Sequence, residues 1–125
     1  MDKERFLEIV CFVHAFVAAV FGIIFIFFTE GFLIIIAWPT TDVTLGRLFG
    51  AALIGFGFSS IIAWKRVDWE KLQIVVEMEI VWITIAIVIL IIGAFTPGYP
   101  IIIWLFIIMF ILFDVAFMYV YYLFR

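Results

Sequence analysis

Five polar side chains lie inside long apolar runs of this sequence. They are His14, Ser59, Glu77, Glu79 and Asp114. Polar and ionisable groups inside membrane-spanning segments are costly, so they usually face a bundle interior and mark a binding site or a proton pathway. We therefore treat these five residues as candidates for a ligand-binding or proton site. The sequence predicts no catalytic residue among them.

The composition predicts membrane helices that position these side chains. Of the 125 residues, 70% are hydrophobic and 14% are charged, whereas soluble domains are about half apolar and about a quarter charged. A span needs roughly 20 apolar residues. We therefore predict a single domain over residues 1–125, an all-α integral membrane four-helix bundle. Its expected spans are residues 6–28, 45–64, 72–95 and 101–124.

The connection over residues 29–44 contains a short apolar segment, residues 32–38, which Pro39 ends. Seven residues are too few to cross a bilayer, so we expect this segment to lie in the membrane interface or to dip in and return. The first apolar run is too long for a signal-peptide core and is expected to be retained.

Lys and Arg are distributed unevenly between the two expected sides of the membrane. One side would hold both termini and six of the seven basic residues, namely Lys3, Arg5, Lys65, Arg66, Lys71 and Arg125. The other side would hold only Arg47. Positive residues accumulate on the cytoplasmic side. We therefore predict a multi-pass protein of the cell membrane with cytoplasmic N- and C-termini.

The five polar side chains are expected at similar depths. At 1.5 Å per residue, His14 would lie about 12 Å from the cytoplasmic end of its helix, and Asp114 about 15 Å. By the same count Ser59 and Glu77 would lie roughly 7 Å in, and Glu79 about 10 Å. The candidate site therefore occupies the cytoplasmic half of the bundle, and the outer half is almost free of polar groups.

Three carboxyl groups in this set, those of Glu77, Glu79 and Asp114, raise two separate questions. Glu77 and Glu79 point about 200° apart on one helix, so one of them faces the bundle and the other snorkels to the headgroups, and the sequence does not decide which. Asp114 has no charged neighbour on its own helix, so we expect it to be protonated or paired with His14 across helices. The alternative for His14 and Asp114 is a purely structural contact.

Small residues recur every four positions along the second expected span. The row is Arg47, Ala51, Gly55, Ser59 and Ala63, and it is flanked by a further pair, Gly46 and Gly50. Small residues let membrane helices approach closely. We therefore expect this row, with Gly55 at its centre, to pack against neighbouring helices.

Arg47 stands at the outer end of this span. Asp42 and Glu30 are available as partners, so we expect these three residues to form an outer anchor that pins the 29–44 connection. The alternative is that Arg47 binds an anionic headgroup or ligand under this connection.

Several chemistries lack the residues they need. No Glu-x-x-His pair is present for a di-iron bundle, the single histidine cannot supply both axial ligands of a haem, and Cys11 is the only cysteine. We therefore predict no metal site, and the sequence identifies no cofactor. No basic stripe is present for nucleic acid.

The segment Arg47-Leu48-Phe49-Gly50-Ala51-Ala52 resembles the start of the second helix in small DoxX-like membrane proteins, where a charged cytoplasmic turn follows that helix. Gly93, Trp104 and the end Tyr119-Val120-Tyr121-Tyr122 also fit this family. The resemblance covers most of the chain and implies a four-helix bundle with a link to respiratory or quinone-associated membrane complexes. It implies no catalytic residues.

Three functions fit these observations. The first is a non-enzymatic bundle whose polar inner half binds a lipid, a quinone or a partner membrane subunit. The second is a homodimeric proton- or cation-coupled small transporter that uses Asp114 or Glu79. Small multidrug transporters have this size, but their essential Glu lies deep in helix one, and Glu8 here is too shallow. The third is a membrane oxidoreductase subunit.

Overall fold

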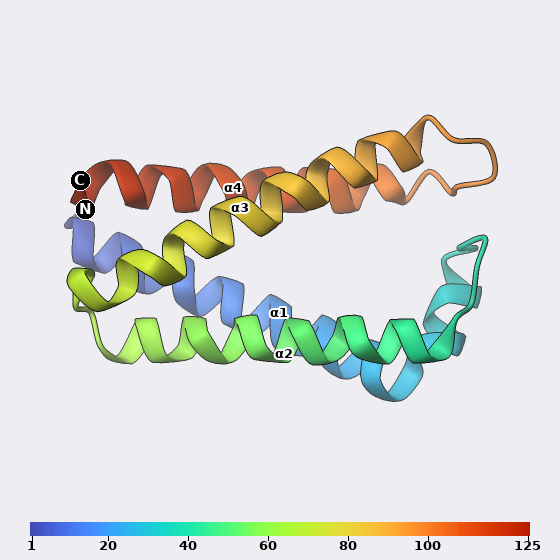
Figure 1. Cartoon of the computed structure of the whole chain (residues 1–125), viewed down its shortest axis with the longest axis horizontal. Helices are drawn as coiled ribbons and strands as arrows, with labels where there is room; N and C mark the ends of the chain where they lie inside the picture. The colour runs from blue at the N-terminus through green and yellow to red at the C-terminus, as the bar shows by residue number, and fades with distance from the viewer.

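The computed structural model describes residues 1–125 and contains four helices (Figure 1). Their bounds are α1 Lys3–Ile35, α2 Val43–Lys65, α3 Trp69–Ala94 and α4 Ile103–Phe124. All four are long and apolar enough to cross a membrane, which confirms the prediction of an all-helical chain with four candidate spans. Both termini and the α2–α3 turn lie at one end of the molecule, and the other two connections lie at the opposite end.

Helix α1 extends seven residues beyond the expected end of the first span. It is interrupted at Phe28, where φ is −131° and ψ is 24°, and then continues to Ile35. The expected interfacial segment is therefore partly helical, because a helix satisfies its own backbone groups where water is scarce. Ala37, at φ 58°, turns the chain out of the helix. The N–H of Trp38 then donates to the carbonyl of Leu33 over 2.9 Å.

The four helices form two pairs. Helix α1 packs closely along α2, α3 packs along α4, and the pairs meet mainly through α1 and α4 (Figure 1). Helices α2 and α3 have the fewest contacts of any touching pair. The bundle is therefore least tightly closed between α2 and α3.

Glycines set the close approach of α1 and α2. A methyl group added at Gly50 would lie 2.8 Å from the carbonyl oxygen of Gly22, and one at Gly57 would lie 3.2 Å from Cβ of Ala18. Gly46 faces Thr29 in the same way. The glycines at 46, 50 and 57 are therefore the positions where α2 cannot carry a larger side chain without moving.

The expected small-residue row of α2 is wrong at its centre. Gly55 is exposed and has no atom of another helix within 4 Å of an added Cβ. The buried positions are instead Gly46, Gly50, Leu53, Gly57, Ser60 and Ala63. Steps of four and three residues keep this set on one stripe, whereas a strict four-residue row winds around a helix of 3.6 residues per turn.

The end of the bundle that holds the termini is filled. Nine buried apolar residues form its core: Leu7, Val10, Cys11, Ala63, Leu72, Val76, Ile83, Phe117 and Val120. The α2–α3 turn closes outside this core, where Nζ of Lys71 lies 2.7 Å from Oδ2 of Asp68. The hydrogen bond from Lys71 lowers the pKa of the Asp68 carboxyl. The opposite half of the bundle is not filled in this way.

Candidate functional site

A central cavity of about 330 Å³ lies in the half of the bundle nearer the α1–α2 and α3–α4 connections. All four helices line it, and 17 of its 21 lining residues are hydrophobic. His14 and Trp82 lie at its inner end, and Trp38, Thr40 and Asp42 lie at its outer end. Its size falls within the range of small-molecule sites, roughly 300–1,000 Å³. The cavity is therefore large enough for the head and part of the chain of an amphiphile.

Four polar side chains, which we call the His14 cluster, meet at the inner end of this cavity. Nδ1 of His14 lies 2.8 Å from Oγ of Ser60, and Nε2 lies 3.5 Å from Oε2 of Glu79. Nε1 of Trp82 donates to the same Glu79 oxygen over 2.6 Å. His14, Ser60 and Glu79 are 4%, 1% and 0% exposed. Three helices thus bring a shielded imidazole and a carboxyl group together.

The contacts of His14 determine in which protonation states both ring nitrogens have a hydrogen-bonding partner. With a proton on Nε2, the ring donates toward Glu79, and Nδ1 accepts the hydroxyl proton of Ser60. The rings of Phe113 and Phe117 pack edge-on against the imidazole at 5.1 Å and 5.2 Å. These contacts fix the orientation of the ring. An added proton would either charge His14, whose Nδ1 then donates to Ser60, or neutralise the Glu79 carboxyl, whose Oε1 has no partner.

Asp114 is buried, as expected, but it is not paired with His14. It is 7% exposed, and its Oδ2 accepts a hydrogen bond from Oγ1 of Thr84 over 3.0 Å. The expected His14–Asp114 contact is therefore wrong, because Ser60 and Glu79 occupy both ring nitrogens and Asp114 faces α3 at Thr84. The Oδ1 atom of Asp114 has no partner. That Asp114 is protonated remains a prediction from the sequence.

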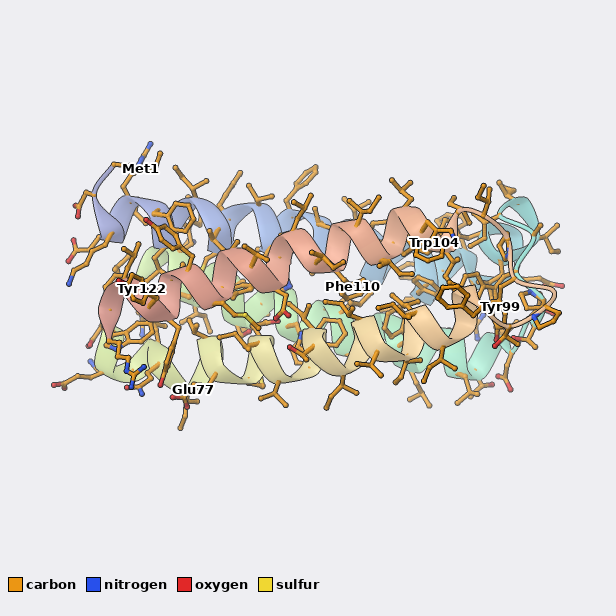
Figure 2. The ribbon with its side chains drawn as sticks, turned by 90° about the horizontal axis from the view of Figure 1, so that it is seen from above. Met1, Glu77, Tyr99, Trp104, Phe110 and Tyr122 are labelled. Carbon is orange, nitrogen blue, oxygen red and sulfur yellow. The ribbon has the colours of Figure 1, made fainter.

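The structure decides between the two glutamates of α3. Glu79 is buried, whereas Glu77 points away from the bundle (Figure 2) and accepts a hydrogen bond from Nε2 of Gln73 over 3.0 Å. The two side chains leave the helix on nearly opposite sides, as the spacing requires. Glu79 therefore belongs to the candidate site and Glu77 does not.

Ser60 replaces Ser59 in the site. Ser59 is half-buried and donates to the carbonyl of Phe56 in its own helix over 2.7 Å. Ser60 was missed by the analysis of the sequence, although its spacing from Gly57 and Ala63 places it on the buried stripe. The expected row selected Ser59 because that row followed four-residue steps only.

The expected outer anchor is not formed. Arg47 and Glu30 are exposed, and no ion pair joins Arg47 to Glu30 or Asp42. The Asp42 side chain instead accepts the N–H of Leu45 over 2.9 Å and caps α2. A carboxylate at this position satisfies a free helix N–H. Asp42 thereby lies at the outer end of the central cavity, separate from Arg47.

No three His, Cys, Asp or Glu side chains are grouped closely enough to bind a metal ion. The site is therefore described by two features: the apolar central cavity and the His14 cluster at its inner end.

A comparison of the chain with protein-family models, curated proteins and solved structures finds no match.

Proposed function

We propose that this protein is a non-enzymatic integral membrane protein that binds a lipid or a quinone in its central cavity. The observation that carries the proposal is a buried imidazole at the inner end of a mainly apolar cavity. An apolar wall suits a hydrocarbon or isoprenoid chain, and a few placed polar groups orient the head of such a ligand. A carbonyl or hydroxyl head would lie against His14 and Trp82 there, and a hydrogen bond to either residue would replace one that it makes within the His14 cluster.

The surface supports a membrane location. Only 24 of the 125 residues are buried, and large apolar side chains are exposed along all four helices. Such a surface needs lipid or a partner membrane subunit to cover it. The proposal includes a location in the cell membrane, cytoplasmic N- and C-termini and membership of the DoxX-like family. These three parts rest on the sequence patterns described above.

A homodimeric proton- or cation-coupled transporter is the second candidate. It is favoured by two buried carboxyl groups that each keep an oxygen without a partner, Glu79 and Asp114. Buried ionisable groups inside membrane spans often belong to proton relays or ion pathways. In this case the His14 cluster would exchange protons rather than orient a ligand head.

Native mass spectrometry of detergent-extracted protein tests the proposal. We expect a bound lipid or quinone that organic solvent releases. In Met109→Trp the added ring would fill the central cavity, and we expect occupancy to fall about tenfold, equivalent to about 1.4 kcal/mol. Met118→Trp is the matched control, because Met118 is 45% exposed on the same helix and does not line the cavity.

Other results would contradict ligand binding. Equal occupancy in Met109→Trp and Met118→Trp would place the ligand outside the cavity. A discrete dimer without a ligand would favour the transporter, and a coloured cofactor would favour an oxidoreductase subunit.

A further inference from the structure

A second, wholly apolar cavity of about 420 Å³ lies between α2, α3 and α4, and we call it the lateral groove. Four of its lining residues, Phe49, Trp82, Leu90 and Phe110, also line the central cavity. The two spaces therefore share lining residues from α2, α3 and α4.

The lateral groove faces the surroundings of the bundle. Ile85 and Ile89, which line the groove but not the central cavity, are 55% and 62% exposed. The groove lies where α2 and α3 make the fewest contacts. Because both helices are candidate membrane spans, this side of the bundle would meet hydrocarbon rather than water.

Trp82 belongs to the His14 cluster and also lines the lateral groove. Its ring stacks on Phe56 of α2 at a centroid distance of 4.8 Å, and it packs edge-on against Phe110 of α4 at 5.4 Å. Its Nε1 is bonded to Glu79. Trp82 thus bridges the weakly closed α2–α3 gap and reaches the polar end of the central cavity. A rotation of this one side chain would break the aromatic bridge and the hydrogen bond together.

Aromatic rings pack together at the connection end of the central cavity, beside the exposed residues Thr40 and Asp42, which also line it. Trp38 packs against Tyr99 at a centroid distance of 5.1 Å and against Phe106 at 6.3 Å. Figure 2 shows Tyr99 at this end of the molecule, opposite Met1 and Tyr122. These contacts join the α1–α2 connection to the start of α4 and the turn before it.

We infer that the lateral groove is the entrance from the membrane to the central cavity, with Trp82 as its gate. The ligand is then a single-chain amphiphile with an uncharged head, dissolved in the bilayer. A charged head would be costly in a passage lined only by apolar side chains, whereas a hydroxyl or carbonyl head can pass and then meet His14. The inference rests on the proposed binding function.

Cross-linking tests the route with tritiated 1-hexadecanol as an uncharged single-chain probe. In a Cys11→Ser background, Phe49→Cys and Ile89→Cys place thiols on α2 and α3 across the groove, and a flexible bismaleimide can join them. Trp38→Cys with Tyr99→Cys is the matched pair at the connection end. Each cross-linked variant is compared with the same variant before cross-linking, so that effects of the substitutions themselves are excluded.

Each cross-link is made either before or after the probe is loaded, and the amount of bound probe and its release rate are measured. We expect a groove cross-link made before loading to reduce bound probe about tenfold, and one made after loading to slow its release about tenfold. The connection-end cross-link should change neither. If only the connection-end cross-link blocks loading, or if neither does, the lateral entrance is wrong while binding itself stands. If the protein without a cross-link binds no probe, the proposed function fails and the entrance fails with it.

A variant without thiols provides an independent measurement. Ala86 lines the groove but not the central cavity, so Ala86→Phe should slow uptake and release of hexadecanol alike and leave its equilibrium affinity unchanged. Ala51→Phe is the control, because Ala51 is exposed on α2 and lines neither space. Equal rates in the two variants would contradict the entrance.

Discussion

The His14 ring is held at both nitrogens by residues from two other helices. Ser60 on α2 and Glu79 on α3 are its partners, so this one side chain links three of the four helices. In a membrane interior few other polar groups can replace a lost partner, and no water is available to do so. His14 therefore contributes to the packing of the bundle whether or not it also meets a ligand.

Two adjacent serines provide a direct test of this contact. Ser60→Ala should lower the free energy of unfolding by about 1 kcal/mol, because it leaves Nδ1 of His14 without a partner. Ser59→Ala removes only a bond within its own helix and should change stability by less than about 0.5 kcal/mol. Unfolding by SDS titration in mixed micelles measures both. Equal losses would mean that the His14–Ser60 bond contributes little.

At the scale of elements, α1 and α2 are held together by close backbone approach, whereas α3 and α4 meet through large side chains. Gly22 of α1 and Gly50 of α2 face each other, and Gly57 meets Ala15 and Ala18. No such glycine contact joins α2 to α3. This difference leaves room for the central cavity and the lateral groove between the two helix pairs.

Gly50 and Gly55 of α2 differ in their surroundings, because Gly50 packs against α1 and Gly55 faces open space. Gly50→Ala should cost about 1–3 kcal/mol, because its methyl group would press on the backbone oxygen of Gly22, which cannot yield as a flexible side chain would. Gly55→Ala meets open space and should leave stability unchanged or raise it by up to about 1 kcal/mol. The same SDS titration applies. A larger loss at Gly55 would mean that another molecule covers that face of α2.

At the scale of the whole molecule, the basic residues are collected at one end. The termini and the α2–α3 turn share this end (Figure 1), and Arg47 alone is near the other. The polar groups of the His14 cluster and Asp114 lie between the two ends, and the central cavity extends from His14 toward the Arg47 end. If the four candidate spans cross a membrane as we propose, their orientation decides which compartment the outer end of the cavity faces.

Reporter fusions measure this orientation. By the distribution of Lys and Arg we expect a fusion at the C-terminus to report a cytoplasmic location and a fusion after Pro97 to report the opposite side. Fusion after Asp68, in the turn at the same end as the termini, is a control that should match the C-terminus. An external C-terminus would reverse the side of the membrane to which Thr40 and Asp42 are exposed.

The sequence alone was sufficient to predict the number of helices, their approximate bounds and a buried Asp114. These properties depend on the lengths of apolar runs and on local charge, which each segment carries independently of its neighbours. The helical continuation of α1 to Ile35 was missed because a short apolar segment can be helical or irregular until its contacts are known.

Only the tertiary structure decided which face of each helix is inside. Helices α3 and α4 are apolar on almost every side, so no hydrophobic stripe separates a face toward lipid from a face toward protein. The choice of Ser60 over Ser59, of Glu79 over Glu77, and of Gly50 over Gly55 followed from how the helices rotate and cross. In a membrane the surroundings are as apolar as the core, so shape and hydrogen bonding between helices, rather than hydrophobicity, fix that rotation.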